Sequence, residues 1–559
     1  MARPAAKRSP ARAGPASGAD ALVAQLKALG ITHVFGIPGV HNLPVYVALE
    51  RSSLRVVLVR HEQTAVYAAD GFARATGRLA VALTTTGPGA ANTAGAMGEA
   101  RASRSPVLHI STQVESRLLE GRGGRFSLHE SPHQRELMDA VSVWTATVAR
   151  AEAIPTMVQR AAIEALAGRR GPSFLEIPHD LLSEKVSWEP QPAVTERTFP
   201  PEPSLVERAV DTLSRAKRPL VWAGGGAISS GAGSVLAKVA EVLDAPIVTS
   251  YAGKGIVAPG HPLCVGFASH QPEVTSLIRS ADAALIVGSD LDGMNTQAWR
   301  LPLPRPRVAI NTIAEDARRN YAADVVIEAD AREMLEAMLP HLRARSSDAG
   351  RRVADVRKAA DASLRATKEF AAPYRFVKTV SAAAGDAVVL ADMAVPGYWL
   401  AGYHRPPRAR TFAYPVGWGT LGFALPAAVG VGASGARALA VCGDAGISYA
   451  LGELATLAQE KLPVAVLVVN DSGYGMLRFD AQDRFGKTFA SDLRAPDFVA
   501  LALSFGIDAR KTTQRELGTA LSWALSQRGP ALVELRATFA PPLTTSPRWP
   551  LRAKKEARR

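Results

Sequence analysis

Two acidic residues follow apolar segments in the C-terminal third of the chain, at a spacing that suits a shared metal ion. Asp444 follows ALAVCG and Asp471 follows LPVAVLVVN, with one helical segment between them. A right-handed β-α-β unit brings the carboxyl ends of parallel strands to one edge, so both carboxylates are expected in one crevice. Gly443 and Gly446 allow close backbone approach, and a helix beginning near Ile447 directs free N–H groups there. A divalent cation holding a diphosphate fits this combination, because carboxylate and phosphate repel each other without a metal; helix capping by both acids is the alternative.

A third acid, Glu62, lies between the apolar segment VVLV, residues 56–59, and an alanine-rich helical segment. The apolar segment has no polar alternation, which is typical of a strand buried on both faces. A charge at the end of such a strand lies at the edge of a core and needs a partner or a function. Stabilisation of the helix N-terminus by this acid is the structural alternative.

Three α/β units are expected to position these acids. Apolar segments alternate with helical patterns in residues 18–185, 204–345 and 374–545. In the first unit the apolar segments are HVFGIPG, RVVLVR, LAVALTTTGPG, SPVLHIS and GPSFLEIP. This rhythm predicts an α/β fold of three doubly wound domains with mainly parallel sheets. The proline-rich residues 186–203 and the charged residues 346–373 are expected to be linkers, the second with some helix.

The net charge of +14 does not indicate a nucleic-acid-binding protein, because most of it lies at the ends of the chain. Residues 1–17 contain four basic residues and no acid, and residues 548–559 contain six basic residues and one acid. We expect residues 1–17 and 546–559 to be flexible basic tails. No apolar run reaches 18 residues and only two cysteines occur, so we expect no membrane span and a cytoplasmic location.

Over almost its whole length the chain resembles the thiamine-diphosphate enzymes of the acetolactate synthase, pyruvate oxidase and benzoylformate decarboxylase superfamily. That family has a Gly-Asp-Gly motif followed about 25 to 30 residues later by an asparagine pair. Here GDAG precedes ND, and Asp471 follows Asp444 by 27 positions. The resemblance implies that Asp444, Asp471 and the backbone carbonyl of Gly473 bind Mg²⁺ and, through it, the diphosphate. Two departures are Ala445 in the first motif and Asp471 in place of asparagine, which keeps an oxygen donor and adds negative charge.

Other motifs assign further residues by the same resemblance. The segment GWGTLGFALPAAVG, residues 417–430, resembles the pyrimidine-binding loop. There the Gly419 carbonyl would accept from the 4′-amino group, and Leu421 would hold the cofactor in its bent conformation. Glu62 corresponds to the activating glutamate, which favours the imino tautomer that removes the C2 proton. The remaining residues implied to contact the cofactor are Gly87, Pro88, Gly89, Asn92, Gln113, Gly443, Ala445, Gly446, Tyr474, Gly475 and Met476.

Two histidines are candidate catalytic residues. His41 lies in GIPGVHN, which resembles the family loop facing the substrate, although a lone loop histidine is more often a capping or surface residue. His129 lies in LLEGRGGRFSLHESPHQREL, which departs from the acetolactate synthase pattern. This segment is similar to the 5-guanidino-2-oxopentanoate decarboxylase group at Leu128, His129, Glu130, Pro132 and Gln134. His129 would then border the substrate pocket, and an ordinary loop histidine is the alternative.

The resemblance implies decarboxylation of a small 2-oxo acid with thiamine diphosphate and Mg²⁺, followed by protonation or by ligation to a second carbonyl. It also implies a homodimer or homotetramer in which Glu62 of one subunit faces the metal site of another. FAD is possible in the central domain, but GSDLDGMNT and INTIAED do not support it, and His261 is a further family-like histidine. The alternatives are specificity for a guanidino 2-oxo acid, a catalytically silent cofactor-binding or regulatory homologue, and a flavin or NAD oxidoreductase.

Overall fold

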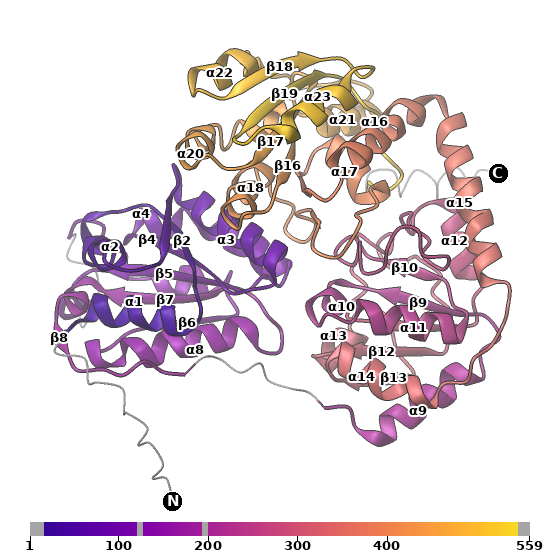
Figure 1. Cartoon of the computed structure of the whole chain (residues 1–559), viewed down its shortest axis with the longest axis horizontal. Helices are drawn as coiled ribbons and strands as arrows, with labels where there is room; N and C mark the ends of the chain where they lie inside the picture. Colours follow the sequence, from indigo (N-terminus) through magenta and orange to yellow (C-terminus); the bar gives the residue numbers. More distant parts are fainter. Residues whose placement is uncertain (1–15, 120–126, 193–199, 546–559) are drawn as a thin grey trace, which may run out of the picture. The chain divides into compact units, whose positions relative to one another are not determined.

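The computed structural model describes residues 16–119, 127–192 and 200–545 (Figure 1). It contains three sheets of five or six parallel strands, so the predicted α/β class with three domains is confirmed. The predicted tails and the glycine-rich residues 120–126 lie outside the described part, except Ala16 and Ser17. Among the described helices, none combines the length and the apolar character that a membrane span needs.

By their contacts, the described residues form two compact units. One unit holds residues 16–69 and 79–192, and the other holds residues 70–78 and 200–545. Ala16 and Ser17, which were expected in the tail, form strand β1 (Ala16–Ser17), which pairs antiparallel with β8 (Lys185–Val186). The first unit therefore begins earlier than the tail prediction placed it.

The first unit is built on a six-stranded parallel sheet. In spatial order its strands are β3 (Arg55–Leu58), β2 (His33–Gly36), β4 (Ala80–Thr84), β5 (Val107–Gln113), β7 (Ser173–Pro178) and β6 (Trp144–Thr147). Its α-helices are α1 (Gly18–Ala28), α2 (Leu43–Glu50), the start of α3 (Glu62–Thr76), α4 (Pro88–Ala91), α5 (Ala94–Ala102), α6 (Ser116–Leu119), α7 (Gln134–Asp139) and α8 (Ile154–Leu166). Strands β4, β5 and β7 are buried throughout, and α1 and α8 lie side by side (Figure 1). The five apolar segments expected here are all strands, and β6 is an additional one.

The second unit contains two parallel sheets. The central sheet has the order β10 (Ile247–Thr249), β9 (Pro219–Ala223), β11 (Ala283–Val287), β12 (Arg307–Asn311) and β13 (Val325–Glu328). Its helices are α9 (Pro203–Ser214), α10 (Gly225–Ser229), α11 (Gly233–Leu243), α12 (Pro272–Arg279), α13 (Ala314–Arg318) and α14 (Ala331–Met338). The segment expected to be a partly helical linker forms α15 (Ala349–Ala366) and the start of α16 (Lys368–Ala384). Helix α15 contacts α12, and α16 contacts α17 and α23 of the C-terminal domain.

The C-terminal sheet has six parallel strands and carries two of the predicted acids. Its order is β15 (Phe412–Ala413), β14 (Val388–Ala391), β16 (Ala438–Gly443), β17 (Val464–Asn470), β19 (Ala531–Arg536) and β18 (Asp508–Thr512). Its helices are α17 (Val395–Tyr403), α18 (Ala424–Ala433), α19 (Asp444–Ile447), α20 (Glu453–Glu460), α21 (Gly475–Phe485), α22 (Phe498–Ser504) and α23 (Leu517–Ser526). Strands β14, β16 and β17 are buried along their whole length, so their ends are fixed by the core. One apolar cluster includes Trp222 of β9 and Trp399 of α17, so the central and C-terminal domains share a core.

Candidate active site

Three aspartates follow neighbouring strands of the C-terminal sheet. Asp392 follows β14, Asp444 follows β16 and Asp471 follows β17. Strand β16 pairs in parallel with β14 on one side and with β17 on the other, so the three residues lie along one edge. The sequence analysis identified Asp444 and Asp471 and missed Asp392. The same signal would have found it, since Asp392 also follows an apolar segment, AVVLA.

The Asp444 carboxylate is buried and only half satisfied. The residue is 2% exposed, and its Oδ1 accepts the backbone N–H of Asp471 at 3.3 Å. Its Oδ2 is buried and has no hydrogen-bond partner among the described residues. The N-cap of α19 is Gly443, so Asp444 does not cap this helix. An unpaired buried carboxylate oxygen is costly unless a cation or donor binds it, so this atom fits a metal ligand better than a helix cap.

Asp471 supplies a second carboxylate beside Asp444. Burial, followed by the charge of Asp444, raises the pKa of Asp471 to about 6. The chain after it passes very close, because a Cβ at position 475 would lie 2.0 Å from Asp471 Oδ2, and only Gly475 leaves that space. Two carboxylates that repel each other favour a divalent cation between them. The structure thus brings together the two side chains that were predicted to bind Mg²⁺.

Asp392 fixes the loop that contains the predicted pyrimidine-binding residues. Its carboxylate accepts the backbone N–H groups of Met393 at 3.0 Å, Gly422 at 3.2 Å and Phe423 at 3.1 Å. Burial nevertheless raises the pKa of Asp392 to about 6. A Cβ at Gly446 would lie 2.3 Å from Asp392 Oδ2, so the start of α19 packs directly on this carboxylate. One buried acid therefore holds residues 417–423, with Gly419 and Leu421, next to the metal-ligand candidates.

A pocket of about 360 Å³ opens beside Asp444. It is lined by Asp444, Ala445, Ser448, Tyr449, Tyr474, Leu493, Arg494 and Ala495. Three of these, Asp444, Ala445 and Tyr474, were predicted to contact the cofactor. The hydroxyl groups of Tyr449 and Tyr474 lie 3.4 Å apart on its wall. Gly473 and Met476, also predicted, lie on the turn after Asp471 and in the first turn of α21.

In the first unit, Glu62 is the first residue of α3 and is held by an amide. The Nδ2 of Asn92 donates to Glu62 Oε2 at 3.0 Å, so two predicted cofactor-binding residues meet. His61 provides the cap of α3, because its Nδ1 accepts the N–H of Gln63 at 3.2 Å. Glu62 is therefore not needed as the cap, and its carboxylate is oriented by a residue that follows the glycine loop at 87–89.

That glycine loop is fixed by a buried hydrogen-bond network. Gly87 has φ +66°, and its N–H donates to Gln134 Oε1 at 2.8 Å. Gln134 Nε2 donates to Glu176 Oε2 at 2.9 Å, and Gln113 Nε2 lies 3.4 Å from the same oxygen. Burial raises the pKa of Glu176, against the hydrogen bonds from Thr147 and Gln134. Glu176, which lies inside a strand, was not predicted. Gln113, which was predicted to contact the cofactor, lies within this network and is 1% exposed.

The two candidate catalytic histidines lie together with a third that the sequence analysis missed. The ring centroid of His41 is 5.5 Å from that of His129 and 4.8 Å from that of His179. Burial, then the charges of His179 and His129, lowers the pKa of His41. The Nδ1 atoms of His41 and His129 are buried and have no hydrogen-bond partner among the described residues. These surroundings favour the neutral form of the His41 imidazole, which can accept or relay a proton.

Comparisons with known proteins match all three domains. The N-terminal TPP-binding domain of thiamine pyrophosphate enzymes matches residues 16–142, the central domain matches 206–338, and the C-terminal TPP-binding domain matches 392–535. The chain belongs to the thiamine pyrophosphate enzymes. The family resemblance inferred from the motifs is therefore confirmed.

Individual thiamine pyrophosphate enzymes are similar to the chain over nearly their full lengths. A protein of Pseudomonas aeruginosa named probable 2-ketoarginine decarboxylase AruI is 35% identical, over 93% of this chain and 94% of the relative. The acetolactate synthase isozyme 3 large subunit of Escherichia coli is 31% identical, over 91% and 92%. A probable acetolactate synthase large subunit of Methanocaldococcus jannaschii is 29% identical, over 93% and 91%.

Thiamine pyrophosphate and thiamine diphosphate are two names of one cofactor. The residues of the candidate site fit this cofactor together with a metal ion. The buried Asp444 Oδ2 has no hydrogen-bond partner in the part of the chain that the structure describes, and Asp471 supplies a second carboxylate close to it. No group of three or more His, Cys, Asp or Glu side chains suited to a metal occurs in residues 16–119, 127–192 and 200–545. Two carboxylates suffice for Mg²⁺ here, because this ion is commonly held by one or two carboxylates together with phosphate oxygens.

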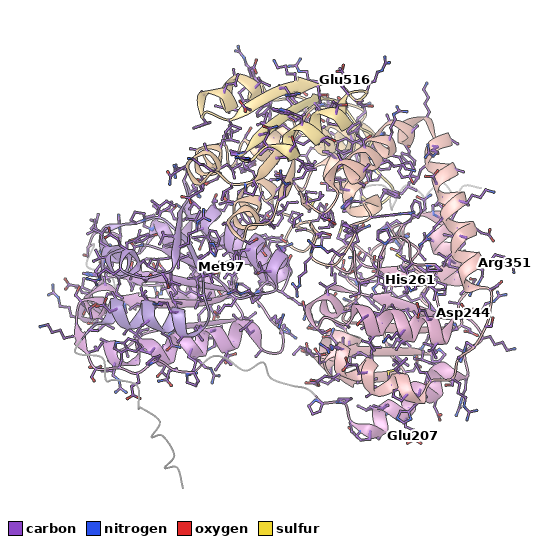
Figure 2. The ribbon with its side chains drawn as sticks, in the orientation of Figure 1. Met97, Glu207, Asp244, His261, Arg351 and Glu516 are labelled. Atoms are coloured by element: carbon purple, nitrogen blue, oxygen red, sulfur yellow. The ribbon has the colours of Figure 1, made fainter. Side chains whose placement is uncertain are left out.

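The central domain contains His261, the further histidine noted in the sequence. His261 lies on the loop between β10 and α12 (Figure 2), and its Nε2 is 3.1 Å from Glu241 Oε1. This pairing with a neighbouring carboxylate accounts for the histidine within its own domain. Nothing in the described residues of this domain points to FAD.

Proposed function

We propose that the protein is a thiamine-diphosphate- and Mg²⁺-dependent decarboxylase of a small 2-oxo acid, with product release by protonation or by ligation to a second carbonyl. The observation that carries this proposal is the buried Oδ2 of Asp444, which no described residue hydrogen-bonds, close to the Asp471 carboxylate. Bound thiamine diphosphate supplies the electron sink for the electron pair left when CO₂ departs.

Each residue of the two sites has a task in this proposal. Asp444 and Asp471, with the carbonyl of Gly473, hold the metal and thereby the diphosphate. Asp392 keeps the loop with Gly419 and Leu421 in place for the pyrimidine ring. Glu62, oriented by Asn92, holds the proton that the pyrimidine N1′ shares, and such positioned acids contribute strongly to proton transfer.

A guanidino 2-oxo acid is the substrate that the similarities favour. The relative named probable 2-ketoarginine decarboxylase is 35% identical over 93% of the chain. The segment with Leu128, His129 and Glu130 resembles the guanidino-acid group, and His129 contacts His41 and lies against the Gly87 loop. In this interpretation His41 and His129 serve the departing product by accepting or donating its proton.

A substrate panel tests the reaction. The purified enzyme with thiamine diphosphate and Mg²⁺ should release CO₂ from 5-guanidino-2-oxopentanoate faster than from pyruvate, with ligated product scored separately. Faster turnover of pyruvate, with acetolactate as product, would favour the acetolactate-synthase-type alternative. Absence of CO₂ release from every 2-oxo acid, with cofactor bound, would favour the catalytically silent homologue. An absorption spectrum without flavin bands would exclude the flavin alternative.

We further propose a homo-oligomer in which Glu62 of one subunit serves the metal site of its partner. Mixing two inactive variants, Glu62→Gln and Asp444→Ala, tests it. In mixed dimers one of two shared sites is intact, so subunit exchange should restore about one quarter of the wild-type sites. If Glu62 and Asp444 of the same subunit form a site, every site stays defective and no activity returns.

A further inference from the structure

The net charge of the proposed metal site matters for diphosphate binding. Asp444 and Asp471 carry two negative charges, which cancel the two positive charges of a Mg²⁺ ion. A neutral centre attracts an anionic diphosphate less than a positive one, so a further cation is needed to hold it. The described part of the chain places one such cation against the Asp471 turn, namely Arg478 on the first turn of α21.

Arg478 donates to two consecutive backbone carbonyls at the start of the turn that follows β17. Its Nη1 donates to the carbonyl of Asp471 at 3.2 Å, and its Nη2 donates to the carbonyl of Ser472 at 3.1 Å. The same Nη1 lies 3.9 Å from Asp471 Oδ2. A Cβ at Gly473 would lie 2.6 Å from Arg478 Nη2, so the glycine leaves room for the guanidinium. The cation is therefore held rigidly beside the carboxylate.

The second carboxylate that pairs with Arg478 belongs to Asp492 and faces solvent. Asp492 Oδ1 accepts from Arg478 Nε at 3.1 Å, but the Asp492 side chain is 81% exposed, against 15% for Asp471. Water screens the exposed pair, so its Coulomb contribution is small. Arg494 lines the pocket as well, but it makes no ion pair with either ligand candidate in the ranges that the structure describes. Although Asp492 is the nearer carboxylate, the charge of Arg478 is less screened by water at the more buried Asp471.

We propose that Arg478 is a charge-balancing residue of the metal–diphosphate site. It returns one positive charge to a centre that Asp444 and Asp471 would otherwise neutralise, and it holds the turn that ends at Gly473. The inference rests on the proposed function and extends it to a residue that does not touch the metal. It predicts opposite effects on two ligands, since Arg478 attracts the diphosphate and repels Mg²⁺.

Calorimetry with the full-length protein tests this inference. Arg478→Gln keeps donors for the two carbonyls but removes the charge, and it should weaken thiamine diphosphate binding at saturating Mg²⁺ about tenfold. Mg²⁺ alone should bind this variant at least as tightly as the wild type. Arg478→Lys, which keeps the charge, should stay within about threefold of the wild type. A variant that weakens both ligands equally would mean a structural role only and would overturn the inference.

A charge-neutral double variant is the decisive arm. Asp471→Asn with Arg478→Gln removes one charge of each sign, so thiamine diphosphate affinity should return to within about threefold of the wild type. Asp492→Asn is the matched control, because it removes a partner of Arg478 in water and should change affinity less than about twofold. If the double variant binds as weakly as Arg478→Gln alone, the charge-balancing role is wrong. If the wild type itself binds no thiamine diphosphate with Mg²⁺, the proposed function fails instead.

Discussion

The N-terminal and C-terminal sheets have the same topology and different chemistry. Numbered along the chain within each sheet, the strands of both follow the spatial order 2-1-3-4-6-5. In the C-terminal sheet, the residues directly after strands 1, 3 and 4 are Asp392, Asp444 and Asp471. In the N-terminal sheet, the residues at these positions are Ile37, Thr85 and Val114, which carry no charge. One framework thus carries acidic residues after three strands of one sheet and uncharged residues at the same positions of the other.

Both sheets nevertheless use the same device to fix a loop. Glu176 is the fourth residue of β7 and accepts from the amide of Gln134, whose oxygen accepts the N–H of Gly87. Each relay therefore starts at a buried carboxylate and ends at a backbone N–H of a loop that carries site residues.

The C-terminal relay has the same order of groups. Glu534 is the fourth residue of β19 and accepts from Asn470 Nδ2 at 2.8 Å. Asn470 Oδ1 then accepts the N–H of Ser472 at 3.0 Å, in the turn after Asp471. The residues after the strands therefore differ in chemistry between the two sheets, while a glutamate within each sheet fixes the geometry of a loop.

Loss of the acid in the N-terminal domain should give the largest effect on turnover. Glu62→Gln is expected to lower kcat about a thousandfold, because a positioned acid is removed from proton transfer. Thiamine diphosphate should still bind, since the metal site is unchanged. NMR measurement of C2 proton exchange on the bound cofactor checks the assignment directly. The control is Glu50→Gln, which changes an exposed glutamate at the end of α2. Exchange at the wild-type rate in Glu62→Gln would contradict the role assigned to Glu62.

Loss of the acid in the C-terminal domain should instead affect binding. Asp444→Ala is expected to weaken Mg²⁺-dependent thiamine diphosphate binding by at least about a hundredfold, because a buried metal ligand is removed. Asp483→Ala, an exposed aspartate on α21, should bind like the wild type. Isothermal titration at several Mg²⁺ concentrations measures both. If Asp444→Ala kept the wild-type affinity for thiamine diphosphate, the acids of the two sheets would not differ in the way proposed.

The sequence predicts the buried strands of both sheets and the apolar edge strand β3, but it misses the other three edge strands, β6, β15 and β18. Strands β16 and β17 are apolar and buried along their length, so their sequence pattern predicts strands. The short strand β6 is half-buried and β18 is the polar segment DARKT, and both lie at the end of their sheet. An edge strand has one paired neighbour and partial contact with water, so its sequence need not be apolar.

Some residues of the candidate site could likewise be predicted from the sequence, and others could not. Asp444 and Asp471 could be predicted because each ends an apolar segment, a signal that also applies to Asp392. The contact of Gln134 with Glu176 joins residues 42 positions apart, and a glutamate inside the strand SFLEIP resembles a surface residue until the fold buries it. Residue types and spacing therefore predict strand-end ligands, whereas partners from different elements need the tertiary structure.

The pH dependence of stability should differ between the wild type, with Asp392 after β14, and the neutral variant Asp392→Asn. The pKa of Asp392 is raised to about 6, so between pH 4 and pH 6 the folded protein holds a proton that the unfolded chain releases. Stability from this group is therefore lost as pH rises through that window. Asp392→Asn does not titrate, so the wild type should lose up to about 3 kcal/mol relative to the variant. Melting temperatures of both proteins without metal and cofactor measure the difference, and Asp471 titrates equally in both. A constant difference would contradict the raised pKa.

The two glutamate relays should give the smallest and most specific effects. In Glu176→Gln or Glu534→Gln, the new amide can donate to the oxygen of Gln134 or Asn470. That side chain then turns its NH₂ group toward the loop N–H, so two donors face each other and the hydrogen bond is lost. One lost hydrogen bond of this kind costs about 1 kcal/mol, or roughly fivefold. Glu176→Gln should lower kcat by about that factor and leave thiamine diphosphate affinity unchanged, because its loop leads to Asn92 and Glu62. Glu534→Gln should weaken the affinity and leave kcat at saturating cofactor unchanged, because its turn follows Asp471. Each variant is the control for the other. If both lowered the same quantity, the glutamates would stabilise the domains in general and the relays would not be specific to their loops.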